Sequence, residues 1–345
     1  MSKRLAITWL CSVAVLFLLV VADILAGPLN IGIADIFRAL FSPYGDNADA
    51  IVLQLRLPRL VTAVVAGAAL AISGAQMQAI FRNPLADPHI LGVSAGAGTG
   101  AAAVMLICGA AGIGGLASGL GLAAGAALGA VCISLIIMAV SMRVHNASAL
   151  LITGVMLGFI MSAVTSIMQY QVDETRLRMF WNWSAGSFSG NSWLEILIMS
   201  VCLAVGTVLA LAGNKGMDVL LFGDDYARAA GADVRKIRGV SMLSCCVMTG
   251  AVTAFCGPVG FIGIVAPHVS RALAGTSSMS AVLPLSLVTG AIMGLAGDLL
   301  SLMFPVPVPV GSAIAILGIP LVFYIMWRGN GGSGGKPCVL SIDFL

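Results

Sequence analysis

Ten apolar runs, each about long enough to cross a lipid bilayer, constrain the fold of this chain more than any other feature. An α-helix needs about 20 mostly apolar residues to span the hydrocarbon core. The runs lie at 6–27, 60–80, 90–109, 114–141, 148–170, 192–213, 238–256, 259–274, 280–303 and 309–327. Only 9% of the 345 residues are charged, against about 25% in soluble domains. The sequence therefore predicts an all-α polytopic membrane protein with about ten transmembrane helices.

Two of these runs leave alternatives open. The run 259–274 is short, and Pro267 is expected to break it because proline removes a helix hydrogen bond. The run 6–27 follows Lys3 and Arg4, so a signal peptide is an alternative to a first span. Its long apolar core, with no Ala-x-Ala site after it, favours a transmembrane helix.

The positions of lysine and arginine predict which loops face the cytoplasm, because cytoplasmic loops carry an excess of both. With the N-terminus inside, 12 of the 17 Lys and Arg residues fall in inner loops and tails. The other five lie in outer segments: Arg38, Arg56, Arg59, Arg176 and Arg178. Both termini are therefore predicted to be cytoplasmic.

The run 60–80 has a distinctive boundary at each end. Arg56 and Arg59 precede it, and they are expected at the membrane interface or beyond it because arginine is costly in hydrocarbon. Asn83, Pro84 and Pro88 follow it, and the two prolines require the chain to turn there. The pattern predicts a charged docking spot on one face and a shaped loop on the other, as a transporter subunit with partners on both sides requires.

Glycines recur every four residues in several runs, and such rows let helix backbones approach closely. We expect dense packing of these spans, although general glycine richness also explains part of the pattern. The rows are Gly92, Gly96 and Gly100; Gly121, Gly125 and Gly129; and Gly290 with Gly294.

The longest inner segment, about 214–237, contains a predicted short helix. Asp224 suits its N-cap, and Gly231 suits its C-terminal end. Ala227 and Ala230 are expected on its surface, where small side chains let another protein approach closely. A solvated loop with a chance helical turn is the alternative.

Few polar side chains lie inside the runs. Asp298 is an acid deep in the run 280–303, and an intramembrane acid is a functional hypothesis by default. Because Asp298 is near the outer end of its run, a structural role is favoured. His89 and His268 each follow a proline without a nearby carboxylate or cysteine, so a structural role is favoured for both over a metal or proton-relay role.

ATP chemistry is testable from the sequence. A phosphate-binding loop needs the pattern G-x-x-x-x-G-K-[ST]. Near Gly335 and Lys336, Asn330 stands at the first glycine position and Pro337 follows the lysine. No Ser-His-Asp or paired-carboxylate arrangement is visible either. The chain is therefore not expected to be an enzyme, and ATP-driven transport would require a separate ATPase.

Together these motifs resemble the permease subunits of the type II ABC importers that take up ferric siderophores, haem and vitamin B12. The matching stretches run in family order from about residue 50 to 328. They are 56–59, 73–78, 83–88, 91–97, 186–187, 221–223 with Ala227 and Gly231, 260–263, 267–268 with Arg271, and 309–311.

The resemblance implies a homodimer or pseudo-homodimer of ten-helix subunits in the bacterial cytoplasmic (inner) membrane. Two ATPase subunits would bind the inner face, and a periplasmic or lipid-anchored binding protein would dock outside. ATP and Mg would belong to the ATPase, with no cofactor in this chain and no nucleic-acid partner. Residues 1–328 would form one permease domain, and the Gly-rich segment 329–345 reads as a flexible cytoplasmic tail.

The resemblance also assigns roles to individual residues. Arg56 and Arg59 would pair with acidic residues of the binding protein, and the span 148–170 would line the pathway. The ATPase-coupling residues would be Leu221, Phe222, Gly223, Asp224, Ala227 and Gly231. The structural or pathway motif would comprise Asn83, Pro84, Pro88, Gly92, Gly96, Pro267, His268, Arg271 and Asp298.

Two positions depart from the family pattern. Leu302 stands where an arginine is usual, and Pro307 stands where glutamate is frequent. Docking of the binding protein is therefore expected to depend mainly on Arg56 and Arg59.

Two alternatives to an ABC permease stay open. One is an ion-gradient-driven secondary transporter. Such a transporter would need several carboxylates inside the membrane, and Asp298 is the one plausible candidate in this sequence. A membrane enzyme or structural membrane protein is the other. The choice among siderophore, haem and cobalamin stays open.

Overall fold

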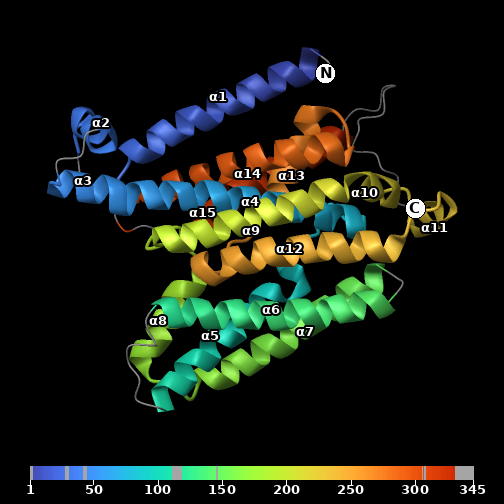
Figure 1. The fold of residues 1–345 in the computed structure, drawn as a ribbon, viewed down its shortest axis with the longest axis horizontal. Coiled ribbons are helices and arrows are strands. Elements are labelled where there is room, and N and C mark those ends of the chain that lie inside the picture. The colour runs from blue at the N-terminus through green and yellow to red at the C-terminus, as the bar shows by residue number, and fades with distance from the viewer. Residues whose placement is uncertain are drawn as a thin grey trace.

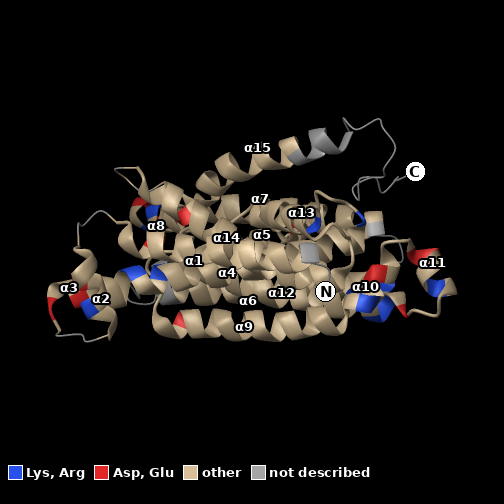
Figure 2. Cartoon of the chain, turned by 90° about the horizontal axis from the view of Figure 1, so that it is seen from above, with Lys and Arg blue, Asp and Glu red and all other residues tan. Residues whose placement is uncertain are grey.

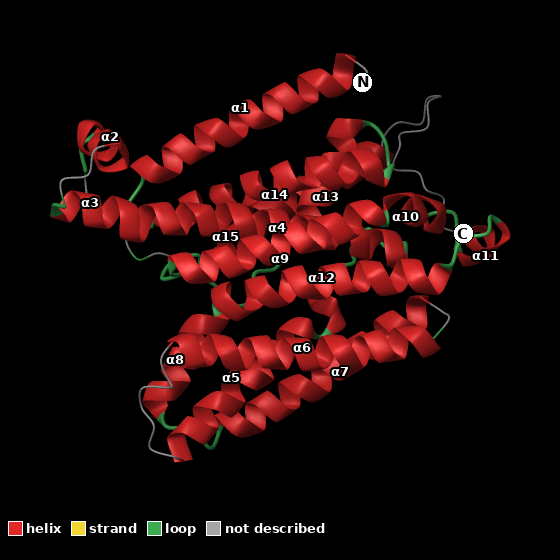
Figure 3. Cartoon of the chain, viewed as in Figure 1, coloured by secondary structure: helices red, strands yellow, loops and turns green. Residues whose placement is uncertain are grey.

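The computed structural model describes residues 3–27, 31–41, 45–110, 119–144, 147–304, 306 and 308–330, and these residues contain helices and loops but no strand (Figure 3). The long or apolar helices are α1 (Lys3–Leu25), α4 (Leu57–Phe81), α5 (Val93–Ala110), α6 (Gly119–Arg143), α7 (Ala147–Gln169), α9 (Trp193–Ala212), α12 (Val234–Cys256), α13 (Ile262–Ala274), α14 (Met279–Leu302) and α15 (Val310–Asn330). The shorter ones are α2 (Ile33–Phe41), α3 (Asn47–Ile51), the π-helix η1 (Val52–Arg56), the 3₁₀-helix η2 (Pro88–Leu91), α8 (Glu174–Ser184), α10 (Asn214–Leu220) and α11 (Asp224–Ala229).

Apolar helices occupy the places of all ten predicted runs. In the described residues, seven helical stretches are long and apolar enough to cross a membrane, one of them being the continuous stretch Asn47–Phe81. The apolar stretches Val93–Cys108, Ile262–Ala274 and Val310–Tyr324 are shorter. The all-α membrane fold is confirmed, while the number of helices that cross the whole bilayer stays a prediction.

The spans run along one common direction (Figure 1), and the Lys, Arg, Asp and Glu residues lie mostly at the two ends of the bundle (Figure 2). α2, α3 and α8 lie at one end, and α10 and α11 lie at the other, where α1 begins. One apolar core joins α4 to α9, α12, α13 and α14, and a second joins α5, α6 and α7 to α4 and α12. α4 is the most enclosed of the candidate spans, with 89% of its apolar window buried, so it connects the two charged ends through the middle of the bundle.

Glycines set the closest helix contacts, as the glycine rows predict. A Cβ atom added to Gly100 would lie 2.0 Å from the carbonyl oxygen of Gly125, and one on Gly129 would lie 2.1 Å from that of Gly96. α4 and α14 meet in the same way, because a Cβ on Gly290 would lie 2.3 Å from the carbonyl oxygen of Gly67. These separations exclude any side chain, so backbone packs directly on backbone.

The predicted turn after α4 is confirmed. Arg82 ends α4 in the left-handed conformation, with φ 47°. The Asn83 side chain accepts a hydrogen bond from the Leu85 amide at 2.9 Å, and the Asp87 side chain accepts one from the His89 amide at 2.8 Å. Pro88 then begins η2. Short polar side chains therefore replace the lost helix hydrogen bonds in this turn.

The prediction that Pro267 breaks its span is wrong, because α13 continues through it from Ile262 to Ala274. Proline has no amide hydrogen to donate to the carbonyl oxygen four residues earlier, that of Gly263. The Gln78 side chain of α4 donates to this oxygen instead, at 3.3 Å, and to the Ile264 oxygen at 3.2 Å. A neighbouring helix thus supplies the missing donor.

Candidate functional site

A cluster of four charged residues lies at the α8 end of the bundle, and we call Asp23, Arg56, Arg59 and Asp298 the charged cluster. Arg59 lies in the first turn of α4, and its guanidinium binds the Asp298 carboxylate of α14 in a bidentate manner. Its Nε lies 3.0 Å from Oδ1 and 2.7 Å from Oδ2, and its Nη2 lies 2.8 Å from Oδ1. The Asp298 side chain is fully buried, and that of Arg59 is 16% exposed. This ion pair therefore joins α4 to α14 away from water.

Asp23 and Arg56 complete the charged cluster from α1 and η1. Asp23 is 3% exposed, and its carboxyl group interacts with both Asp298 and Arg59. Arg56 is 8% exposed, and its Nη1 donates to the carbonyl oxygens of Ile24 at 2.9 Å and Leu25 at 3.2 Å. These oxygens end α1, where a cation is favourable. The charged cluster thus joins four elements, α1, η1, α4 and α14.

Arg56 and Arg59, expected from the sequence as a charged docking spot, are both largely buried and bound within the chain. Their role in docking a partner stays a prediction. Asp23 was missed in the sequence, although it lies inside the run 6–27 and the rule that singled out Asp298 applies to it equally. Leu302, one turn beyond Asp298, is half-buried, and Pro307 lies outside the described residues.

His89, His268 and the half-buried Arg271 each bind a neighbouring group of the chain, and the contact of Arg271 joins α13 to α4. Nε2 of His89 lies 2.8 Å from the Val259 carbonyl oxygen, and Nδ1 contacts the Ser94 hydroxyl. Nδ1 of His268 lies 2.7 Å from the Ile264 oxygen, and Arg271 donates to the Gln78 side chain. Within the described residues, no group of three His, Cys, Asp or Glu side chains could hold a metal ion. The structural reading of both histidines agrees with these contacts.

The loop between α9 and α12 forms the second site, at the opposite end of the bundle. It contains two short helices, α10 and α11, where the sequence predicted one. The prediction that Asp224 caps α11 is wrong: Gly223 is the N-cap, with φ 109°, and Asp224 is the first helical residue. Its carboxylate accepts a hydrogen bond from Nη2 of Arg238 at 2.6 Å, which fixes α11 to α12. Gly231 follows the helix with φ 80°, as expected of a residue that ends it.

The expected contact face of α11 also needs correction. Ala227 is fully buried and packs with Leu220 and Val234 beneath the loop, although Ala230 is exposed as predicted. The large exposed side chains are Phe222 (74%) and Tyr226 (58%), whose ring centroids lie 5.4 Å apart. The small Ala227 side chain therefore faces inward, where it leaves room for α10 and α12 to pack against α11. The aromatic rings of Phe222 and Tyr226 face outward.

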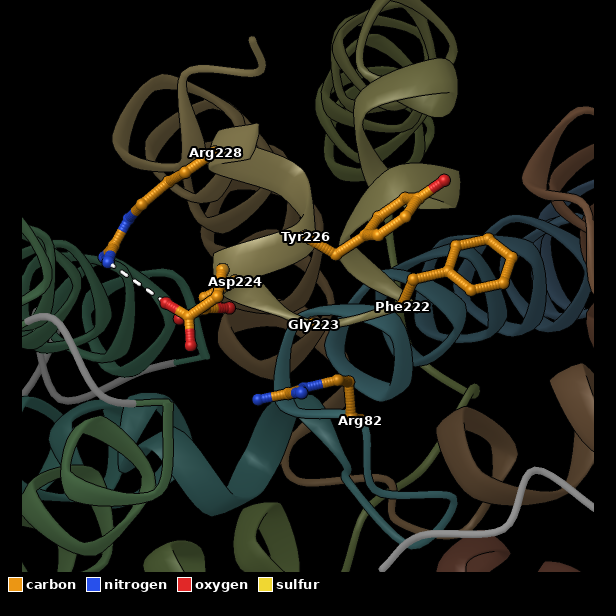
Figure 4. A pocket seen from close by; sticks show the side chains of 7 residues that line it. Arg82, Phe222, Gly223, Asp224, Tyr226 and Arg228 are labelled. Atoms are coloured by element: carbon orange, nitrogen blue, oxygen red, sulfur yellow. Dashed lines mark ion pairs between the residues drawn. The ribbon is translucent and has the colours of Figure 1, made fainter. Parts of the chain in front are cut away.

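These rings border a groove of about 460 Å³, which we call the α11 groove (Figure 4). Its lining residues are Arg82, Phe222, Gly223, Asp224, Asp225, Tyr226 and Arg228. Asp225 and Arg228 form an ion pair of 3.6 Å at its edge. Arg82 is one of the 12 Lys and Arg residues that the sequence places in inner segments, but no site role was predicted for it.

Arg82 reaches the α11 groove from the end of α4. Its Nη1 would lie 3.1 Å from a Cβ atom on Gly223, so the absence of a side chain there leaves room for the guanidinium. Arg82 makes no hydrogen bond or ion pair with the part of the chain that the structure describes. The groove thus combines exposed aromatic rings with a guanidinium that is available for an anionic partner group.

An apolar helical bundle with its polar sites at two opposite ends is the architecture of a multi-pass membrane protein. The family model of the FecCD transport family matches residues 15–328. The chain belongs to the FecCD transport family.

Curated relatives and a solved structure agree with this assignment. The chain is 35% identical over 330 residues to the vitamin B12 import system permease protein BtuC of Citrobacter koseri, covering 95% of this chain and 96% of the relative. It is 35% identical over 318 residues to the hemin transport system permease protein HmuU of Yersinia pestis, covering 90% and 94%. A solved inward-facing structure, described as a metal-chelate type ABC transporter, superposes with a TM-score of 0.80 at 26% identity and covers 94% of this chain and 99% of its own.

Proposed function

We propose that this chain is the permease subunit of an ATP-driven importer for a ferric siderophore, haem or a cobalamin, in the bacterial inner membrane. The similarity to permeases named for vitamin B12 and hemin supports the substrate class. The observation that carries the proposal is the α11 groove, because it offers a contact surface at one end of a chain whose sequence has no phosphate-binding loop. ATP and Mg would then bind a separate ATPase.

The ATPase would contact the α11 groove. Exposed aromatic rings dominate the energetics of protein interfaces when they enter a partner's pocket, and Phe222 and Tyr226 are held side by side for this. Arg82 would receive a carboxylate of the ATPase beside them. Since α11 is fixed to α12 by the Asp224–Arg238 pair, a displacement of the loop would be passed into that span. Leu221 and Gly223 would shape the loop rather than touch the partner.

The functional unit would be a homodimer with two ATPase subunits. α7 supports this, because the apolar stretch Ser148–Gln169 is only 11% buried in the single chain. Its exposed side chains include Met156, Phe159 and Ile160. A second copy packed along α7 would place this face at the dimer axis, where it would line the substrate pathway.

A binding protein would dock at the α8 end. Arg56 and Arg59 would take part only if its acidic groups compete with Asp298 and with the α1 carbonyl oxygens for the two guanidiniums. Docking and the packing of α1, α4 and α14 would then be linked.

Reconstitution tests the proposal. The chain would be placed in proteoliposomes with its co-purified ATPase and binding protein, and uptake of labelled haem, cobalamin and ferric siderophores would be measured. We expect uptake of one class that requires ATP and continues when an ionophore dissipates ion gradients. Uptake that needs no ATPase and stops with the ionophore would instead establish the secondary-transporter alternative.

A further inference from the structure

α2 carries an exposed apolar face that the permease function does not use. Ile33, Phe37 and Phe41 recur every four residues along this nine-residue helix and are 61%, 60% and 78% exposed. The Phe37 and Phe41 rings are stacked, with centroids 6.3 Å apart. Ile36 and Ala39, on another side of the helix, pack inward against Val52. α2 thus has one apolar side for the protein and a second apolar side that the chain leaves uncovered.

Ion pairs fix which way this second side faces. Arg38 lies in the remaining sector of α2 and pairs with Asp46 just before α3, with Asp35 at 3.5 Å and with Asp49 at 4.0 Å. Asp49 is buried and also accepts a hydrogen bond from the Gly45 amide at 2.7 Å. Because these contacts prevent α2 from rolling about its axis, Ile33, Phe37 and Phe41 are held outward.

The position of α2 corresponds to the surface of the bilayer. Ile24, in the last turn of α1, packs with Ile36 and Val52, so α2 is level with the end of α1. The apolar stretch Leu5–Leu25 has 21 residues, or about 31 Å of helix, which matches the hydrocarbon thickness. The end of α1 is therefore at the boundary between hydrocarbon and headgroups.

The direction of α2 fits the same location. In Figure 1 the spans run horizontally, whereas α2 is seen nearly end-on beyond α1, so it lies across the spans and along the membrane plane. The exposed apolar face of α1, which includes Phe17, Leu18 and Leu25, leads up to it. A short helix with apolar and charged sectors that lies in this plane places its apolar side at the boundary of the acyl chains.

We infer that α2 is an interfacial anchor whose Ile33, Phe37 and Phe41 side chains insert among the lipids at the α8 end of the bundle. Its partner is the headgroup and upper acyl region of the bilayer. Through Val52 and the Arg38 ion pairs, the anchor holds α3 and η1, and with them the start of α4 and the charged cluster, at a fixed depth.

Depth-dependent quenching tests this inference on the full chain in lipid nanodiscs. Phe37→Cys would be labelled with a bimane fluorophore in a background with Cys11→Ser, Cys132→Ser and Cys338→Ser. Phe17→Cys serves as the hydrocarbon control, and Asn47→Cys, exposed on α3, serves as the aqueous control. We expect lipids with a nitroxide near the headgroup to quench the position-37 label at least twofold more than lipids with a nitroxide at the chain end, and aqueous iodide to quench mainly the position-47 label.

Other outcomes overturn the anchor. If iodide quenches the position-37 and position-47 labels equally, α2 stands in water. If the position-37 label is shielded only after a binding protein is added, or if the unlabelled Phe37→Cys thiol is oxidised by added copper phenanthroline to a disulfide with its copy in a second subunit, the apolar side is a protein interface. Phe41→Cys repeats the measurement should Phe37→Cys not fold. The result does not depend on ATP-driven uptake, so it is independent of the proposed function.

Discussion

Arg59 and Asp298 are separated by 239 positions in the chain, yet three hydrogen bonds join their side chains. At the scale of single residues, this contact changes how a substitution should be interpreted. Replacing Arg56 and Arg59 by glutamate, a natural test of docking, would place two new carboxylates beside Asp23 and Asp298. Loss of uptake in that variant would report misfolding. Milder substitutions are therefore needed.

We predict that Asp298→Asn lowers the free energy of unfolding by about 3–5 kcal/mol, because it removes the bidentate ion pair of the largely buried Arg59 and leaves Asp23 as its acidic neighbour. The triple variant Asp23→Leu with Arg59→Met and Asp298→Leu should lose less than this, since none of the three interacting charges is then left buried without its partners. Denaturation in detergent, followed by circular dichroism, measures both. The exposed pair Glu174–Arg178 is the control, and Arg178→Gln should change stability by less than about 1 kcal/mol. If the triple variant loses as much stability as the sum of the losses from its three single substitutions, the pairing is contradicted.

A second residue-scale prediction concerns Gln78. Gln78→Leu removes the donor that replaces the amide of Pro267 and the acceptor of Arg271. Each buried group left without a partner costs about 1–3 kcal/mol, so this variant should be clearly less stable than the parent. Adding Pro267→Ala should recover part of the loss, because alanine restores the amide donor to the Gly263 carbonyl. Equal stability with and without Pro267→Ala would show that Gln78 does not serve this carbonyl.

At the scale of elements, the contact between α5 and α6 depends on glycine. Gly100→Ala would place a Cβ atom 2.0 Å from the Gly125 carbonyl oxygen, which forces the helices apart. We expect a loss of about 1–3 kcal/mol, as for other overpacked sites. Gly98→Ala is the matched control two residues away, because a Cβ there has no neighbour within 4 Å. Thermal unfolding in detergent should separate the two, and an equal response would mean that the close approach does not stabilise the bundle.

The α11 loop allows recognition to be separated from folding. Phe222→Ala with Tyr226→Ala should weaken retention of the ATPase at least tenfold while leaving the loop folded, because both rings are exposed. The Ala227→Trp variant should also fail to retain the ATPase, but for a different reason. The large indole would separate Leu220 from Val234 and loosen the loop, so a protease should cut the loop faster than in the parent. Pull-down of the ATPase and limited proteolysis provide the two measurements. Ala230→Ser, at an exposed position, is the control. Full retention in the double variant would remove the α11 groove as the ATPase contact.

At the scale of the whole molecule, the chain spans the membrane but carries no ATP site in its sequence. We predict that the purified chain binds no ATP analogue at millimolar concentration and is a dimer in the functional complex. Equilibrium dialysis and native mass spectrometry check these two points. Nucleotide binding by the chain alone, or a single copy in an active complex, would contradict the proposed assembly.

The sequence by itself determined the helical membrane class, the places of the apolar helices, the turn at Asn83–Pro88 and the glycine-rich contacts. These follow from local physics: apolar length sets a span, Pro84 and Pro88 turn the chain after α4, and the missing side chain of glycine permits close approach. Tertiary structure alone decided that Arg56 and Arg59 are bound internally, that Asp23 joins them, that Gln78 supports α13 and that Ala227 faces inward. Each of these depends on which helix lies beside which, and a buried polar group takes its partner from the nearest neighbour in space, wherever that lies in the chain.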